Sequence, residues 1–182
     1  MNNAQPAHIL TAIEDIRETL IKARLFREAW WAIEGVHPKR SDIVRALNFY
    51  SDFFSSIRPA LWIAYIATLS LLFDKDAKSI SLGNIPEIEN ETGYAALIKK
   101  GEILRKYRNK LIAHRDLKCV HEKQVKDLGL SYDDIKGILE ESCLYFDRAA
   151  LKLKIDPLPS LSCEGDFLRL VDDLNRQFSS NS

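Results

Sequence analysis

The sequence is poor in the residues on which small disulfide-rich or metal-stabilised folds depend. Its 182 residues include three cysteines, Cys119, Cys143 and Cys163, and no two of them form a C-x-x-C pair. An odd number of unclustered cysteines argues for free thiols in a reducing compartment and against a zinc knuckle. A chain of this length can bury roughly 70% of its unfolded surface and needs no such support. We therefore expect a cytoplasmic protein.

Long apolar runs are also missing. The most apolar stretch, Ala60 to Phe73, has 14 residues, fewer than the roughly 18 to 20 that span a bilayer. It also carries Tyr65, Thr68 and Ser70. The N-terminus, Met1 to Pro6, lacks the positively charged region and apolar stretch of a secretion signal. We expect no membrane association and assign the apolar stretch to a buried core helix.

Alternating apolar patterns and Asn-Gly or Asp-Gly turns are nearly absent, whereas apolar residues recur at steps of three and four. This spacing predicts an all-α fold, an up-and-down helical bundle of about five main helices. We expect one domain over residues 1–182, with a core at about 8–150 and a C-terminal helical extension at about 160–178. The expected helices span about 8–33, 42–56, 59–73, 91–114 and 131–151, followed by a short one at 166–178.

Two of these expectations concern particular segments. The third helix is apolar all round and is therefore expected to be central, with Pro59 in its first turn. Residues 74–89 are rich in Ser, Asp, Gly and Pro, which predicts a long connection rather than a helix. The sequence assigns no role to this connection.

Charge of one sign does not prevail overall, since 26 Lys and Arg residues balance 26 Asp and Glu residues. The charges are nevertheless separated along the chain. Lys99 to Lys118 contains eight basic and two acidic residues, a net charge of +6. Such a segment can attract a polyanion even though the whole chain is neutral.

The basic segment also has a helical pattern, with an apolar stripe at Leu97, Leu104, Tyr107 and Leu111. At 100° per residue, Arg108 and His114 fall about 60° to either side of this stripe. Polar groups at the edge of a core cost free energy unless they are paired, so these two residues either have a structural partner or are retained for a function. The two residues are about 120° apart, so one straight helix cannot direct both at one phosphate. Local unwinding near Ala113, or a second copy across a twofold axis, would complete the site.

Arginine and histidine together permit cleavage of RNA without a metal ion. Histidine can take the 2′-hydroxyl proton or protonate the leaving oxygen, while arginine binds the phosphate and stabilises its developing charge. The product would carry a 2′,3′-cyclic phosphate. We expect Arg105, Lys110 and Arg115 to hold the flanking backbone of the RNA, and we expect no cofactor.

The segment from Arg108 to His114 matches the R-x(4 to 6)-H pattern of the HEPN superfamily, including the polar Asn109. The longer string RNKLIAHRD, together with Leu72-Phe73-Asp74 and Ser79-Ile80-Ser81-Leu82, resembles the abortive-infection AbiU-type branch. The resemblance implies a helical bundle, a homodimer with the site at its interface, and a ribonuclease or its inactive relative. It implies that Arg108 binds phosphate, Asn109 assists and His114 is the acid-base. An antitoxin or other protein partner is also implied.

One residue departs from related toxins that are silenced by nucleotidylation of a tyrosine two residues after the histidine. Asp116 stands there, so we do not expect that control, and the role of Asp116 itself is open. Two alternatives remain: a non-catalytic HEPN-like module that binds RNA or protein, and a helical dimerisation protein in which Arg108 and His114 pair structurally. Cys119, His121 and Glu122 are too few to predict a metal site.

Overall fold

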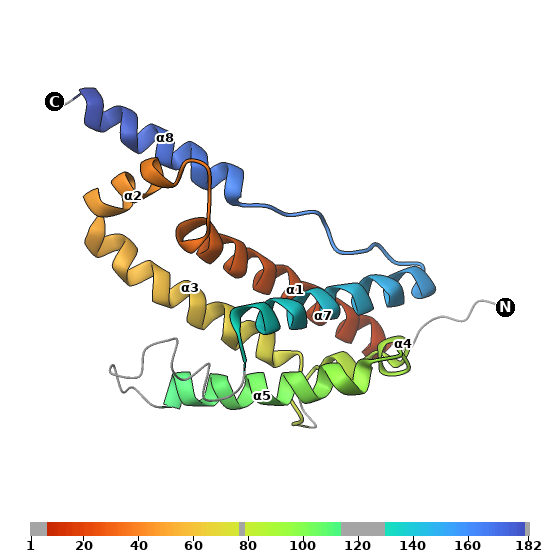
Figure 1. Ribbon diagram of the computed structural model, residues 1–182. Coiled ribbons are helices and arrows are strands. Elements are labelled where there is room, and N and C mark those ends of the chain that lie inside the picture. Colours follow the sequence, from red (N-terminus) through yellow and green to blue (C-terminus); the bar gives the residue numbers. More distant parts are fainter. Residues whose placement is uncertain (1–6, 77–78, 114–129, 181–182) are drawn as a thin grey trace. The chain divides into compact units, whose positions relative to one another are not determined.

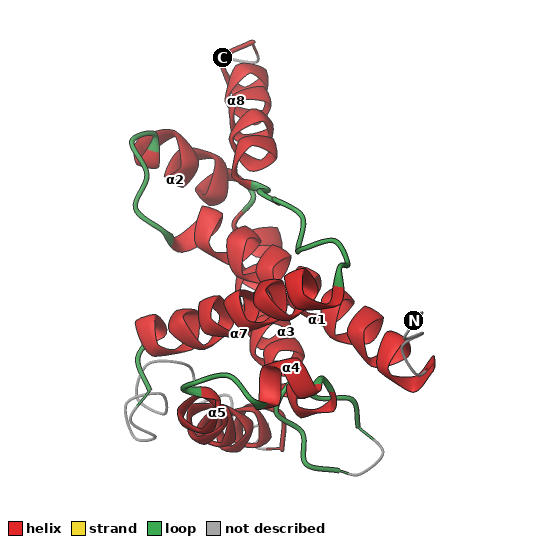
Figure 2. Ribbon diagram, turned by 90° about the vertical axis from the view of Figure 1, so that its right-hand side faces the viewer, coloured by secondary structure: helices red, strands yellow, loops and turns green. Residues whose placement is uncertain are grey.

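The computed structural model describes residues 7–76, 79–113 and 130–180. Within these ranges the regular structure is helical, and Figure 2 shows helices joined by loops, without a strand. The predicted all-α fold is therefore confirmed. In chain order the helices are α1 (Ala7–Glu34), α2 (Arg40–Phe49), α3 (Ser51–Leu71), η1 (Leu82–Asn84), α4 (Pro86–Glu89), α5 (Tyr94–Ala113), α7 (Tyr132–Leu153) and α8 (Glu164–Ser180) (Figure 1).

Contacts group the chain into two compact units. The first unit comprises residues 1–23 and 66–159, and the second comprises residues 24–65 and 160–182. Both α1 and α3 cross the division, so each contributes residues to both units. The expectation of one domain stays a prediction.

The first unit contains the basic helix. Its core includes Leu20, Leu72 and Phe146, all essentially inaccessible to solvent. Helix α7 packs against both α4 and α5. It begins at a capping box: the Ser131 hydroxyl accepts from the Asp134 amide at 3.1 Å, and the Asp134 carboxylate accepts from the Ser131 amide at 2.7 Å. These bonds satisfy amide donors that the first turn of a helix cannot pair internally.

The connection after α3 contains more helix than predicted. Its second half forms η1 and the single turn α4. Leu82, Ile85 and Ile88 are spaced three residues apart and are fully buried. Burial of this short apolar stripe favours helical turns in a segment whose Ser, Gly and Pro content predicted a loop.

The break between the second and third helices also differs from the prediction. It falls at Tyr50, whose φ of −109° and ψ of 45° are not helical, and Pro59 lies inside α3 rather than in its first turn. A proline removes the hydrogen bond to the carbonyl four residues earlier, which here belongs to Ser55. Because Ser55 is exposed, water can bind that carbonyl and the helix continues.

Helix α3 is less central than its composition predicted. Trp62, Tyr65 and Leu69 are buried, but Ile63 and Leu71 are exposed. Among the described helices α3 is long and apolar enough to cross a membrane, and about a third of its most apolar stretch is buried. Core helices of soluble proteins have the same length and composition, so this property does not identify a membrane span.

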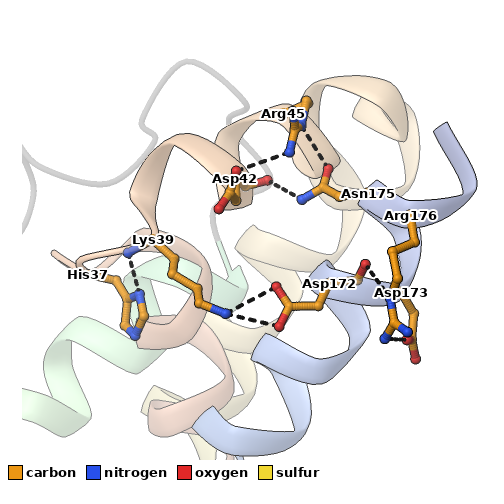
Figure 3. A network of polar contacts seen from close by, with 8 residues as sticks. All are labelled: His37, Lys39, Asp42, Arg45, Asp172, Asp173, Asn175 and Arg176. Carbon is orange, nitrogen blue, oxygen red and sulfur yellow. Dashed lines mark hydrogen bonds and ion pairs between the residues drawn. The ribbon is translucent and has the colours of Figure 1, made fainter. Parts of the chain in front are cut away.

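In the second unit α8 packs along α2. Val171 of α8 and Ile43 and Ala46 of α2 form a fully buried cluster. Polar contacts surround it (Figure 3): the Asn175 side chain accepts from Arg45 Nε at 3.0 Å and donates to the Asp42 carbonyl at 3.1 Å. This places the predicted C-terminal helix against α2.

Candidate functional site

Helix α5 carries the basic segment and sets the direction of its side chains. Leu97, Leu104 and Tyr107 are fully buried, and α5 packs against α7 through its buried face. The predicted apolar stripe is thus confirmed at these three positions, while Leu111 is half-buried. The side chain of Arg108 is 18% exposed, so it lies at the edge of the core as its helical phase predicted.

The guanidinium of Arg108 contacts two groups. Its Nε and Nη2 donate to Oδ1 of Asn109 at 3.1 and 3.0 Å. Its Nη1 lies 3.8 Å from Oδ2 of Asp74, an ion pair without a direct hydrogen bond. One edge of the guanidinium is therefore bound by the adjacent asparagine, and the opposite nitrogen faces a carboxylate.

Asp74 also binds Arg105, one helical turn before Arg108. Arg105 Nη2 donates to Oδ1 of Asp74 at 3.2 Å, and the side chains of Arg105 and Asp74 are 24% and 21% exposed. The Nε of Arg105 is buried and has no hydrogen-bond partner among the described residues. The sequence predicted that Arg105 binds RNA and assigned no role to Asp74. The available signal was the segment Leu72-Phe73-Asp74, which resembles the AbiU-type branch.

Of the remaining predicted site residues the structure describes Lys110 alone, and Lys110 is not part of this cluster. Lys110 is exposed, and two residues along a helix correspond to a rotation of about 200°, so it leaves α5 on another side than Arg108. His114 and Arg115 lie outside the described residues, as do Asp116 and the segment that contains Cys119, His121 and Glu122. The acid-base role of His114 therefore stays a prediction.

Carboxylates offset part of the positive charge of α5. Glu102 pairs with Lys75, and Glu141 of α7 pairs with Lys100 at 2.7 Å. The hydrogen bond from Lys75, with its positive charge, holds the pKa of Glu102 below its usual range. The remaining exposed lysines of α5, which are Lys99, Lys106 and Lys110, form no ion pair with the residues that the structure describes. These three can attract a polyanion.

A cavity of about 250 Å³ lies in the second unit, between α1, α2 and α8. Its polar lining is already paired: His37 Nε2 lies 3.4 Å from the Glu164 carboxylate, and Glu28 accepts from the amide of Cys163 at 3.1 Å. No group of three metal-ligating side chains occurs in the part of the chain that the structure describes. The cluster around Arg108 is thus the candidate site.

Comparison with known proteins supports the resemblance on which the site was predicted. The model of the HEPN family described as AbiU2 matches residues 7–170, which covers α1 through the first part of α8. No curated protein and no solved structure matches the chain.

Proposed function

Because the chain belongs to the AbiU2 family of HEPN proteins, we propose that it is a metal-independent endoribonuclease of an abortive-infection or toxin system. The main support for the proposal comes from the contacts and the exposure of the Arg108 side chain. Its guanidinium is bound by Asn109 and faces Asp74, yet the side chain remains 18% exposed. Within the described residues Nη1 makes no hydrogen bond. The edge formed by Nη1 and Nη2 can therefore bind two oxygens of a phosphate.

The proposed reaction is attack of an RNA 2′-oxygen on the adjacent phosphorus. The bond to the 5′-oxygen breaks, which leaves a 2′,3′-cyclic phosphate and a 5′-hydroxyl. His114 takes the proton of the attacking hydroxyl or gives one to the leaving oxygen. Arg108 stabilises the extra negative charge on the phosphate oxygens. Asn109 holds the Arg108 guanidinium, and no step requires a cofactor.

Binding of the flanking RNA depends on charge. Lys110 and Arg115 contact neighbouring phosphates, and Arg105 does so with the donors that its pair with Asp74 leaves. A homodimer supplies a second Arg108 and His114, which would allow one histidine to act as base and the other as acid. The protein acts in the cytoplasm, with α3 as a core helix, and an antitoxin or other protein partner restrains it.

The proposal is tested by incubating end-labelled structured and unstructured RNA with the protein in EDTA. Wild type should cut and leave cyclic phosphate ends, while Arg108→Ala and His114→Ala should not. Arg148→Gln is the matched control, because Arg148 is an ion-paired arginine of the same unit, 3.2 Å from Glu91. It should cut like wild type.

Other results would contradict the proposal. RNA binding that falls steeply with salt, without cleavage by any protein, would identify a non-catalytic binding module. Dimerisation that is insensitive to salt, without RNA binding, would identify a structural role for Arg108 and His114. Cleavage that survives both substitutions would place the site elsewhere.

A further inference from the structure

Three successive residues after α3 lie along α5. Phe73 packs its ring against Gly101, Asp74 faces Arg105 and Arg108, and Lys75 pairs with Glu102. Each contact joins the same short segment to a different level of the helix. The position of the Asp74 carboxylate along α5 is therefore determined by its neighbours on both sides.

The contact between Phe73 and Gly101 depends on the missing side chain of glycine. A Cβ at position 101 would lie 2.8 Å from Cε1 of Phe73 and closer still to Cγ and Cδ1. Phe73 is 3% exposed, so its ring has little space into which to move. Two backbone hydrogen bonds also hold the segment: the Asp74 amide donates to the Leu71 carbonyl at 3.1 Å, and the Leu82 amide donates to the Leu72 carbonyl at 3.0 Å.

The carboxylate lies between two guanidinium groups that would otherwise repel each other. Oδ1 of Asp74 accepts from Arg105, and Oδ2 faces Nη1 of Arg108 at 3.8 Å. All three side chains are less than a quarter exposed, so solvent screens this interaction less than it would on an open surface. Arg108 is thus held by Asn109 on one edge and by Asp74 near Nη1.

We infer that Asp74 is a positioning residue, which orients Arg108 so that its free edge faces the RNA phosphate. The inference rests on the proposed function. Asp74 does not contact the reacting atoms and acts through Arg108. Its loss should slow the chemical step more than it weakens RNA binding, because removal of one negative charge does not reduce attraction of a polyanion.

The kinetic test compares Asp74→Asn and Asp74→Ala with wild type. We expect kcat to fall by about tenfold to a hundredfold, with KM unchanged or lower. Glu91→Gln is the control, since Glu91 is also a carboxylate paired with two basic residues, Arg148 and Lys152. It should leave kcat unchanged. Equal kcat in wild type and both Asp74 variants would overturn the inference.

A second measurement does not depend on cleavage. The Nη signals of Arg108, assigned by their loss in Arg108→Lys, can be followed by ¹⁵N NMR, because Asp74 faces Nη1. We expect hindered rotation about the Nε–Cζ bond in wild type, seen as separate Nη1 and Nη2 signals, faster rotation in Asp74→Ala, and no change in Glu91→Gln. Unchanged rotation in Asp74→Ala would overturn the inference. A wild type that cuts no RNA, with the expected NMR change, would refute the proposed function and leave Asp74 as the residue that positions Arg108.

Discussion

Replacement of Gly101 by alanine tests how closely the segment after α3 approaches α5. Two opposing effects determine the result. Alanine stabilises a helix interior by about 1 kcal/mol relative to glycine. Against this, the new Cβ would overlap the ring of Phe73, which is buried.

The magnitude follows from the geometry. Overpacking of a well-packed core costs about 1–3 kcal/mol. Because the Cβ would lie 2.8 Å or less from three ring carbons of Phe73, we take the upper end of that range. After subtraction of the helix gain, Gly101→Ala should lower the free energy of unfolding by about 2 kcal/mol. For a chain of this size that corresponds to a Tm lower by roughly 4–8 °C.

Gly137 is the matched control. It also lies inside a helix of the first unit, α7, but a Cβ there meets no atom within 4 Å. Gly137→Ala should therefore raise Tm, by roughly 2–4 °C. Calorimetry or thermal circular dichroism of the two variants gives the comparison. A Tm that rises in both would refute the close approach of Phe73.

A double variant separates overlap from other causes. Phe73→Leu alone leaves a cavity and should destabilise the protein. Combined with Gly101→Ala it should cost less than the sum of the two single changes, because the smaller side chain relieves the overlap. Additive effects would show that the two positions do not contact each other.

Three further predictions concern other parts of the fold. Ser131→Ala removes the cap of α7 and should lower the free energy of unfolding, measured in urea, by about 1 kcal/mol. Hydrogen bonds from Ser131 hold the pKa of the Asp134 carboxyl below its usual value, so the stability that Asp134 contributes is present above the usual pKa and is lost as pH falls through the lowered one. Wild type and Asp134→Asn should therefore converge in stability in strong acid. Asn175→Ala should lower the free energy of unfolding by about 1–3 kcal/mol, because it removes two part-buried hydrogen bonds to α2. Asp172→Asn, at an exposed ion pair, should lower it by less than about 1 kcal/mol. Equal losses would contradict the burial of Asn175. Burial and the nearby Glu28 raise the pKa of the Cys163 thiol, so its alkylation at pH 8, followed by peptide mass spectrometry, should be slower than that of free cysteine.

Local sequence signals predicted the long helices well. The expected start of α7 at about residue 131 is within one residue of the observed start, and apolar spacing predicted the extent of α1. The failures lie where local signals are weak or misleading. No glycine or proline marks the break at Tyr50, whereas Pro59 suggested a helix start that does not exist.

At the candidate site, too, local sequence signals predicted one feature and missed another. The helical phase of α5 was sufficient to place Arg108 at the edge of the core, because neighbours three and four residues apart share a helix face. It could not reveal Asp74, which lies 34 residues earlier in the chain and reaches Arg108 after the backbone leaves α3. That encounter depends on the packing of Phe73 on Gly101.

The all-helical fold class, the family and the edge position of Arg108 could therefore be predicted from the sequence, because each depends on residue type and on spacing within one segment. Only the folded protein shows which carboxylate faces Arg108 and which surface of α2 receives α8. Those choices depend on contacts between segments far apart in the chain, where shape and burial select the partner and local propensity carries no information.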